Sequence, residues 1–219
     1  MGNIQQQIGF APLLILDGGH GITTPEKRTP PLADGTVIQE YEFNKAVVRL
    51  ADMYARNAGF RTFLTSPTEE DTPLAVRTAR ANQAYNDYRA ELQNQGINTQ
   101  GLDPAIFISV HYNTLGTEFQ ERANGIETFY YPGSVRGQRL AELLRISLLQ
   151  GTPQVDRGTK PANFYVLRRT QMPAALIEAG FMDYRPEAEL MRSQAFREEV
   201  AREIVAAALQ YYGFNQEAG

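Results

Sequence analysis

The stretch PLLILDGGHG at residues 12–21 begins as a short, continuous apolar run and ends in two glycines, a histidine and a third glycine. A run of this length that is stopped by glycine is typical of a β-strand buried on both faces. Two later stretches, AIFISV at residues 105–110 and AALIE at residues 174–178, have the same character. Strands buried on both faces occur mainly in parallel sheets, so the three runs indicate the centre of such a sheet.

The segments between these runs predict helices and further strands. Apolar residues recur at helical spacing from Glu40 to Ala58, and Gly59 follows where a helix cap is expected. We expect further strands at residues 60–65, 125–131 and 163–167, and further helices at residues 72–93, 136–149 and 186–212. Strands that alternate with helices favour an α/β fold with a largely parallel sheet. No linker rich in Pro, Ser or Gly divides the chain, which indicates one domain over residues 1–219.

The composition restricts the possible chemistry. The 219 residues contain no cysteine and two histidines, His20 and His111, so any metal has to be bound by His, Asp or Glu. The formal charge of −4, from 21 basic and 25 acidic residues, argues against binding to nucleic acid or to an anionic membrane. The apolar run at residues 10–16 is too short to span a bilayer, and no basic segment precedes it as in a signal peptide. We therefore expect neither a membrane span nor an export signal.

Three predicted strands carry a reactive side chain at or just beyond their carboxyl ends. These residues are His20, His111 and Glu178, and in open α/β sheets ligands bind at that edge. A glutamate at the start of the first long helix, Glu40 or Glu42, adds a second carboxylate. Three ligands with an open position for water, and a carboxylate base nearby, make up a catalytic zinc site. The spacing does not separate Glu40 from Glu42, and a buried salt bridge is the structural alternative for Glu178.

Seven motifs occur in constant order along the chain: LLILDGGHG (13–21), EYEFN (40–44), FRTFLTS (60–66), R-x-x-x-A-N (77–82), FISVHYN (107–113), GIETFYY (125–131) and DRGTKPANFYVLRRTQMPAALIEAGFMDY (156–184). Together they resemble the zinc-dependent N-acetylmuramoyl-L-alanine amidases of the amidase_3 family, which include catalytic domains of endolysins and autolysins. These enzymes cut the amide bond between N-acetylmuramic acid and the L-alanine of the peptidoglycan stem. The resemblance covers about residues 12–213, which we expect to be the domain core.

The resemblance implies a single α/β domain with a mixed, mostly parallel sheet flanked by helices on both faces. It implies that His20, Glu40 and His111 bind one zinc ion per chain and that Glu178 is the catalytic carboxylate. It favours Glu40 over Glu42, because the family's metal-binding glutamate stands four residues before an asparagine, as Glu40 does here. Zinc would activate water and polarise the substrate carbonyl, while Glu178 accepts the water proton and passes it to the departing amine.

The chain departs from the usual family pattern in three places. Gly18 stands where many members have proline, and Ile22 where a second glycine is frequent, which affects only the shape of the loop. Residues 86–103 lengthen the link to the His111 strand, and we interpret them as an extended helix and surface loop that could border the substrate groove. After His111 there is no room for the long inhibitory helical insertion of some division-associated members. We therefore expect no obligatory protein activator.

The expected substrate, peptidoglycan, would lie in a shallow groove formed by loops around residues 23–36, 114–124 and 157–163. The candidate substrate-binding residues are Arg157, Lys160, Asn163 and Asn113. Acidic or amide groups of the stem peptide are the partners that these side chains suit, and an equal alternative is that they are solvated loop residues. The chain is expected to be a monomer.

Two other functions remain open. A zinc peptidase that cuts another stem-peptide bond would use an H-x-x-E motif, but Thr23 stands at that position after His20. A non-catalytic cell-wall binding module need not keep Glu178. The expected place of action is the cell wall, reached either as a phage or prophage endolysin released from the cytoplasm or as an excised domain of a secreted autolysin.

Overall fold

Strand β1 (Leu13–Gly18) lies inside the sheet, and its side chains are buried along its whole length. The computed structural model describes residues 4–99 and 101–214. Leu14 and Leu16 belong to one hydrophobic cluster, and Leu13 and Ile15 belong to another. Because side chains alternate between the two faces of a strand, the continuous apolar run reflects one core on each face of the sheet.

The strands that the structure describes form one six-stranded sheet in the order β2-β1-β3-β6-β4-β5. β2, β1, β3 and β6 are parallel, whereas β4 is antiparallel to β6 and parallel to β5. The other strands are β2 (Arg61–Leu64), β3 (Ala105–Asn113), β4 (Ile126–Tyr130), β5 (Asp156–Pro161) and β6 (Ala174–Phe181). The predicted mixed, mostly parallel sheet is therefore confirmed.

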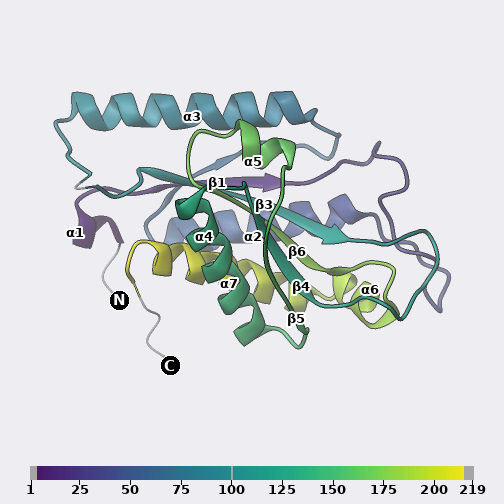
Figure 1. Ribbon diagram of the computed structural model, residues 1–219. Helices are drawn as coiled ribbons and strands as arrows, with labels where there is room; N and C mark the ends of the chain where they lie inside the picture. Colours follow the sequence, from purple (N-terminus) through teal and green to yellow (C-terminus); the bar gives the residue numbers. More distant parts are fainter. Residues whose placement is uncertain (1–3, 100, 215–219) are drawn as a thin grey trace.

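Helices cover both faces of this sheet (Figure 1). α2, α4 and α7 pack in the larger hydrophobic cluster, and α3 and α5 lie on the opposite face. The helices are α1 (Ile4–Ile8), α2 (Glu40–Asn57), α3 (Leu74–Asn94), α4 (Val135–Gly151), α5 (Tyr165–Arg169), α6 (Arg185–Arg192) and α7 (Gln194–Tyr211). The molecule is a single-domain α/β protein, as predicted. The predicted domain boundaries, residues 1 and 219, lie outside the described residues.

No helix within residues 4–99 and 101–214 combines the length and the apolar character that crossing a bilayer requires.

The prediction of a strand at residues 163–167 was wrong. The sheet strand is β5, and the chain then turns into helix α5, in which Val166 and Leu167 are buried in the cluster beneath α3. Aromatic and β-branched residues favoured a strand at this point, but the two buried residues are also well placed on a short helix. β5 is at the sheet edge and mostly half-buried, so it lacks the apolar run that identifies a central strand.

The closing helix predicted over residues 186–212 is in fact two helices, α6 and α7. Ser193 separates them in an extended conformation, and its side chain accepts a hydrogen bond from the backbone N–H of Phe196 at 3.3 Å. Serine is a favoured N-cap because its hydroxyl satisfies a free N–H at a helix start. The apolar periodicity continues through the break and therefore concealed it.

Candidate active site

The side chains predicted at strand ends meet at one edge of the sheet. His111 on β3 is the register partner of Glu178 on the neighbouring strand β6. His20 follows β1 by two residues, and β1 pairs with β3 as far as Gly18 and Val110. Neighbouring strands are about 4.8 Å apart, so strand pairing alone brings the three residues together.

His20, Glu40 and His111 form a compact cluster whose potential ligand atoms lie within 4.8 Å of one another. Glu40 lies between the imidazoles, with Oε2 3.3 Å from His20 Nε2 and Oε1 3.1 Å from His111 Nδ1. The two rings are nearly perpendicular, and their centroids are 4.9 Å apart. Two imidazoles and a carboxylate that converge in this way are a donor set suited to zinc.

Glu42, the alternative to Glu40, stabilises the start of α2 instead. Its Oε1 accepts a hydrogen bond from the backbone N–H of Gln39 at 3.2 Å, and the Gln39 side chain contacts the helix in return. This reciprocal arrangement is a capping box. The structure therefore brings Glu40, and not Glu42, to the two histidines.

The backbone around His20 is shaped by its neighbours. His20 has a φ of 61°, in the left-handed region that residues other than glycine seldom adopt. A Cβ on Gly19 would lie 2.1 Å from His111 Cε1, and a Cβ on Gly21 would lie 2.1 Å from the backbone N of Asp71. Burial lowers the pKa of His20 to about 4, so its imidazole is neutral at pH 7, the form that binds metals.

Glu40 has the properties expected of a carboxylate that faces a cation. It is 1% exposed, and its Oε1 accepts hydrogen bonds from Asn44 Nδ2 and from the backbone N–H of Tyr112, both at 3.0 Å. Burial alone would raise the pKa of Glu40, but the hydrogen bond to His111 and the charges of both imidazoles lower it to about 2. Its Oε2 finds no hydrogen-bond donor within the described residues. A buried, ionised oxygen without a donor is costly unless a cation compensates it, so the residues fit a bound metal ion.

A buried polar network behind the cluster fixes the end of β1. Asp17 accepts hydrogen bonds from Ser109 Oγ at 2.8 Å and from Thr65 Oγ1, and Arg77 NH1 lies 3.7 Å from its Oδ2. Arg77 also pairs with Asp71 at 2.8 Å. Sequence reasoning did not identify this network as part of the site. Asp17 lies within the first motif and Arg77 opens the fourth, but nothing in their spacing indicated that they meet.

Lys45 is a second supporting residue that the sequence did not reveal. It is 2% exposed on α2, and its Nζ donates to the carbonyl oxygens of Ser66, Thr68 and Glu70, the last at 3.2 Å. The loop that it holds contacts the His20 loop, because the backbone N–H of Ile22 donates to the Glu69 carbonyl at 2.8 Å. Lys45 therefore supports His20 through the intervening loop.

Glu178 lies beside the cluster and outside any ion pair that the structure describes. Its Oε2 is buried and has no hydrogen-bond partner among residues 4–99 and 101–214. Burial, with repulsion from Glu40 and Glu127, raises the pKa of Glu178 well above its ordinary value. The structural alternative of a buried salt bridge therefore finds no support. A carboxylate with high proton affinity next to a metal-type cluster is suited to accept a proton.

Three of the four candidate substrate-binding residues converge on a glutamate that sequence reasoning did not single out. Glu127 on β4, the register partner of Glu178, accepts hydrogen bonds from Asn113 Nδ2 at 2.6 Å, Arg157 Nε at 3.2 Å and Lys160 Nζ. Its place in the GIETFYY motif was the one available signal. Arg157 and Lys160 are thus partly neutralised, although Lys160 remains 43% exposed in its side chain.

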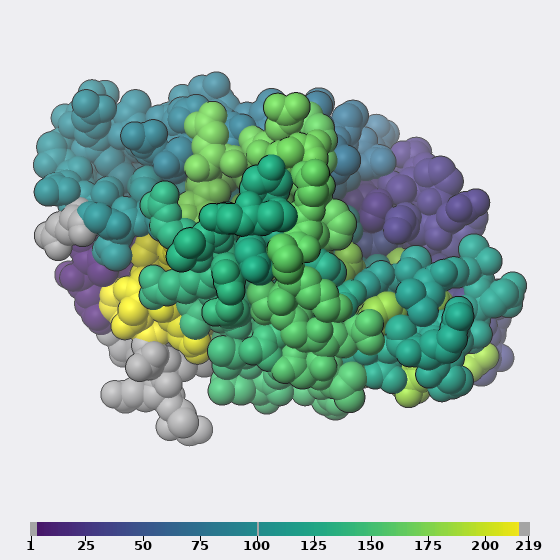
Figure 2. Space-filling view, viewed as in Figure 1, coloured from purple at the N-terminus to yellow at the C-terminus, as the bar shows by residue number. Residues whose placement is uncertain are grey.

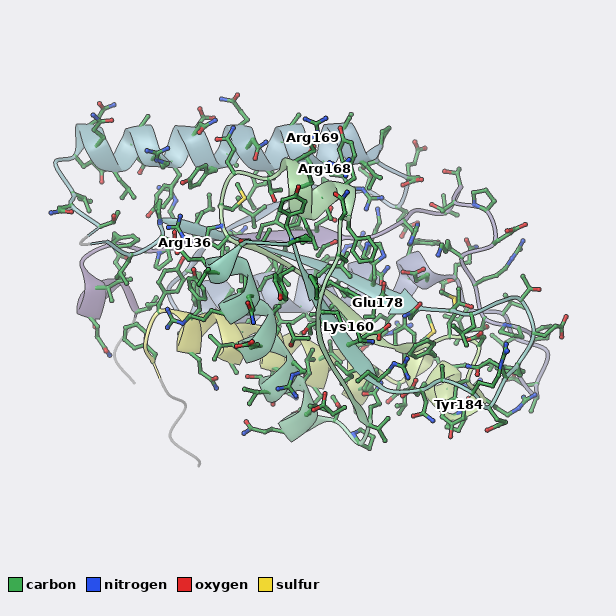
Figure 3. All side chains as sticks on the ribbon, in the orientation of Figure 1. Arg136, Lys160, Arg168, Arg169, Glu178 and Tyr184 are labelled. Atoms are coloured by element: carbon green, nitrogen blue, oxygen red, sulfur yellow. The ribbon has the colours of Figure 1, made fainter. Side chains whose placement is uncertain are left out.

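Asn163, the fourth candidate, does not join this group. Its Oδ1 accepts a hydrogen bond from Arg168 NH1 at 2.5 Å on the exposed side of α5. Figure 3 shows Arg168 well apart from Glu178 and Lys160 in this view.

Two of the three loops predicted to form the groove are tied to the site edge. In the loop at residues 23–36, the Lys27 carbonyl accepts a hydrogen bond from the backbone N–H of Glu40 at 2.9 Å. In the loop at residues 114–124, the backbone N–H of Leu115 donates to Asp183 Oδ2 at 2.8 Å, just beyond β6. The third segment, residues 157–163, was predicted as a loop but belongs largely to strand β5. That correction leaves two loops and one strand edge around the cluster.

Comparison with known proteins shows which family the chain belongs to. Residues 14–210 match the family model described as N-acetylmuramoyl-L-alanine amidase. The chain belongs to this family. It is 36% identical over 213 residues to an uncharacterised cell wall amidase of Bacillus anthracis, covering 91% of this chain and 35% of that relative. It is 28% identical over 190 residues to the N-acetylmuramoyl-L-alanine amidase CwlM of Bacillus licheniformis, covering 86% of this chain and 64% of that protein.

The crystal structure of an N-acetylmuramoyl-L-alanine amidase from Clostridium difficile 630 has a similar fold. It superimposes with a TM-score of 0.72 at 25% identity, over 92% of this chain and 96% of that chain. The chain thus spans nearly all of a solved amidase, but about a third and just under two thirds of the two Bacillus relatives. Because N-acetylmuramoyl-L-alanine amidases are hydrolases, the family membership places the chain in a hydrolase class.

Proposed function

We propose that this protein hydrolyses, with a bound zinc ion, the amide bond between N-acetylmuramic acid and L-alanine in peptidoglycan. The observation that carries the proposal is the His20, Glu40 and His111 cluster with Glu178 as the register partner of His111. The family match and the cell wall amidase relatives support the same activity.

In this proposal His20, Glu40 and His111 would hold the metal. Zinc in such a site supplies an activated water and polarises the scissile carbonyl. Burial keeps the His20 imidazole neutral, and the buried Glu40 carboxylate balances part of the cation's charge. Asn44 and the Tyr112 backbone fix the Glu40 carboxylate through its Oε1, and its buried Oε2, which has no hydrogen-bond donor among the described residues, would be available as a ligand atom.

Glu178 is the proposed proton carrier. Its high proton affinity lets it take a proton from the attacking water and later give that proton to the L-alanine amine, which must leave as a neutral group. The pKa of Glu178 is raised while that of Glu40 is lowered. Two carboxylates at one edge of the sheet thus suit two different roles, with Glu40 as ligand and Glu178 as acid and base.

The stem-peptide side of the substrate is assigned to the Glu127 group. Lys160, with its partly exposed side chain, is the group we assign to an acidic position of the peptide. Arg157 packs over the Phe181 ring, 4.8 Å from its centroid, and is held by Glu127, so we assign it a supporting role. Asn113 donates to the other Glu127 oxygen and completes this group.

The test is product analysis combined with metal analysis of the Glu178→Gln variant. Mass spectrometry of digested peptidoglycan should show new amino-terminal L-alanine; other new ends would indicate a zinc peptidase, and no release would indicate a binding module. The Glu178→Gln variant should lose turnover by at least about 100-fold and should still bind one zinc ion per chain. Retained turnover would contradict the role of Glu178, and lost zinc binding would move Glu178 into the ligand set.

Partners and place of action stay predictions. A solved relative, the CwlD amidase of Clostridioides difficile, is in complex with the GerS lipoprotein, so freedom from an activator needs a direct activity assay of the purified chain. A monomeric state and the alternatives of endolysin and excised autolysin domain are likewise expectations. Peptidoglycan is the partner that the family membership supports.

A further inference from the structure

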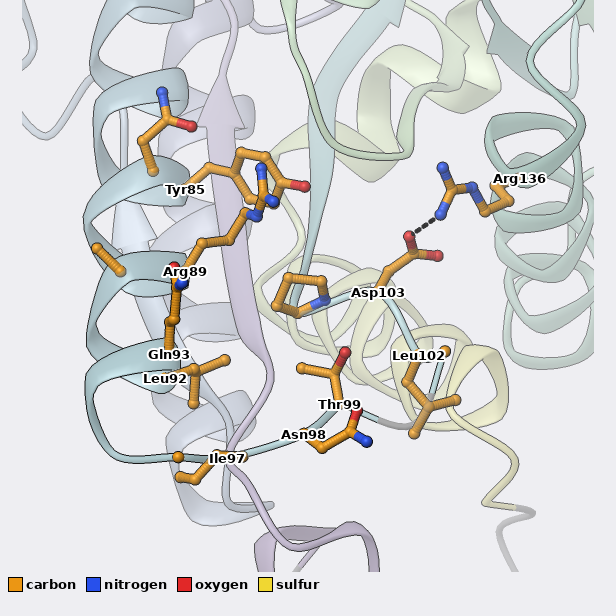
Figure 4. Close-up of a pocket in the computed structure, with 15 residues that line it drawn as sticks. Tyr85, Arg89, Leu92, Gln93, Ile97, Asn98, Thr99, Leu102, Asp103 and Arg136 are labelled. Atoms are coloured by element: carbon orange, nitrogen blue, oxygen red, sulfur yellow. Dashed lines mark hydrogen bonds and ion pairs between the residues drawn. The ribbon is translucent and has the colours of Figure 1, made fainter.

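The residues that lengthen the link between α3 and β3 form a hollow away from the metal-type cluster. The hollow has a volume of about 940 Å³ and lies between the second half of α3, the connection that follows it and the start of α4. Figure 4 shows Tyr85 and Arg89 on the α3 side and Arg136 with Asp103 on the other. Its size is within the range of natural ligand sites.

This hollow lies at the amino ends of the strands, whereas Glu178 lies near their carboxyl ends. Asp103 and Pro104, which line it, directly precede β3, whereas His111 is near the other end of that strand. The six steps along the strand from Ala105 to His111 span roughly 20 Å at 3.3 Å per residue. Figure 3 accordingly shows Arg136 and Glu178 far apart along the sheet. The expectation that residues 86–103 border the catalytic groove is therefore wrong, because α3 runs back to the amino ends of the strands.

The lining combines an aromatic ring with planar polar groups over an apolar floor. Arg89 stacks on the Tyr85 ring, 5.4 Å from its centroid, and no carboxylate of the described residues forms an ion pair with it. Asn86 and Gln93 contribute amides on the same helix. Leu92 belongs to the cluster between α3 and the sheet and forms part of the floor. Rings with neighbouring amide and guanidinium groups suit sugars, whose faces are apolar and whose edges carry hydroxyl groups.

The opposite wall is fixed in place. Asp103 accepts hydrogen bonds from Arg136 NH1 and, at 2.6 Å, from the Tyr211 hydroxyl. Arg136 also lines a second, smaller hollow of about 170 Å³, together with Tyr131, Arg168 and Gln171. Because Arg136 lines both hollows, they meet at this side chain, and we call the two together the track. A track with aromatic and polar side chains in both parts suits an extended polymer better than a single small molecule.

We infer that this track is a second carbohydrate-binding site, which takes a glycan strand along the edge opposite the catalytic cluster. The ligand class is a chain of N-acetylated sugars whose carboxylates are free because their stem peptides have been removed, since Arg89, Arg136 and Arg168 line the track and Asp103 is the one carboxylate among its lining residues. The identification of that chain as peptidoglycan glycan rests on the proposed function, whereas sugar binding itself does not. The site would hold the enzyme on its polymer while the catalytic cluster at the carboxyl ends of the strands acts on the stem peptides.

The experiment is calorimetric titration with soluble glycan strands from which all stem peptides have been removed. Such strands contain no bond for the catalytic edge to cut, so the result does not depend on the proposed activity. Arg89→Ala should weaken binding at least tenfold, and Asn86→Ala, a change at an exposed position, should weaken it severalfold. Arg56→Ala is the matched control, because Arg56 is an exposed arginine on α2 and its loss should change the dissociation constant less than twofold.

Three outcomes would overturn the inference: no binding of strands by the wild-type chain, equal weakening by Arg89→Ala and Arg56→Ala, or binding of a polyol phosphate polymer alone. Hydrogen exchange should show protection at residues 85–103 when strands bind; protection confined to the His20 side would also contradict it. With sacculi from which part of the stem peptides has been removed, Arg89→Ala should raise KM and leave kcat unchanged. With a short muramyl peptide, both constants should stay unchanged.

Discussion

The close approach of Gly19 to His111 leads to a sharp prediction for the Gly19→Ala variant. The added methyl group would lie 2.1 Å from Cε1, 2.4 Å from Nε2 and 2.6 Å from Nδ1 of the His111 ring. Carbon atoms pack at about 3.5 Å or more, so the ring and the methyl group have to separate by roughly 1.4 Å. Gly19 does not have a positive φ, so the effect comes from the side chain alone.

A displacement of this size is incompatible with the cluster. Metal–ligand distances vary by only about 0.2 Å in working sites, and His111 supplies one of the three proposed ligands. We expect Gly19→Ala to lower zinc affinity by more than about 100-fold, beyond the usual effect of changing a residue that merely orients a ligand. Without metal, the overpacked site should lower the free energy of unfolding by about 1–3 kcal/mol.

Gly18→Ala is the matched control, one residue away. Its added Cβ would lie 3.2 Å from Lys45 Cγ and from Val48 Cγ2, which are side-chain atoms that can move by a few tenths of an ångström. Its effect on stability should therefore be smaller, and its zinc affinity should match that of the wild type. The comparison separates damage to the ligand from general damage to β1.

The assay is competition for zinc with a chromophoric chelator, followed by thermal melts with and without zinc. At a free zinc concentration 100 times the dissociation constant, binding stabilises the wild type by about 2.7 kcal/mol. Gly18→Ala should gain the same amount, and Gly19→Ala should gain almost nothing. If Gly19→Ala binds zinc as tightly as Gly18→Ala does, His111 is not a ligand in the position seen here.

Two further changes test other parts of the structure. Lys45→Met should lower the free energy of unfolding by about 1–3 kcal/mol in urea titrations, because the carbonyl oxygens of Ser66, Thr68 and Glu70 lose their shared donor; an unchanged midpoint would contradict this role of Lys45. Burial, with repulsion from Glu199, raises the pKa of Glu203 to about 7, so the wild type should lose stability as the pH rises from 4.5 through 7. Glu203→Gln should therefore raise the free energy of unfolding at pH 8, by less than about 1 kcal/mol because solvent partly screens this group, and should leave it unchanged at pH 4.5. Glu118→Gln, at an exposed position, is the control substitution, and an equal gain in that variant would contradict the account.

The central strands and the site edge could be predicted because each depends on local sequence. β1, β3 and β6 are continuous apolar runs, since both faces of the sheet are covered. Once their parallel arrangement is expected, the rule that ligands bind at the carboxyl ends places His20, His111 and Glu178 together. Hydrophobic pattern and strand direction are therefore sufficient for these three residues.

Other features depend on contacts between distant residues, which no local pattern encodes. The residue spacing did not decide whether Glu40 or Glu42 joins the histidines. In the structure Glu42 caps the helix and Glu40 enters the cluster. Glu127 sits in a recognisable motif, but its three donors come from β3 and β5. The edge strand β5 was missed because a half-buried strand needs no apolar run.

The carboxyl ends and the amino ends of the strands differ in how charged side chains are arranged. This difference separates the proposed catalytic site from the proposed binding site. At the carboxyl ends, Glu40, Glu127 and Glu178 are brought close together, which is unfavourable unless cations are present. Arg157 and Lys160 compensate Glu127, so the pair of Glu40 and Glu178 is left for a metal ion and a proton. At the amino ends, arginines outnumber carboxylates among the described residues that line the track, and no two carboxylates lie close together there. The track is therefore suited to binding a polymer and not to cutting it. The proposed catalysis and the proposed retention on the polymer therefore use different residues of the same sheet.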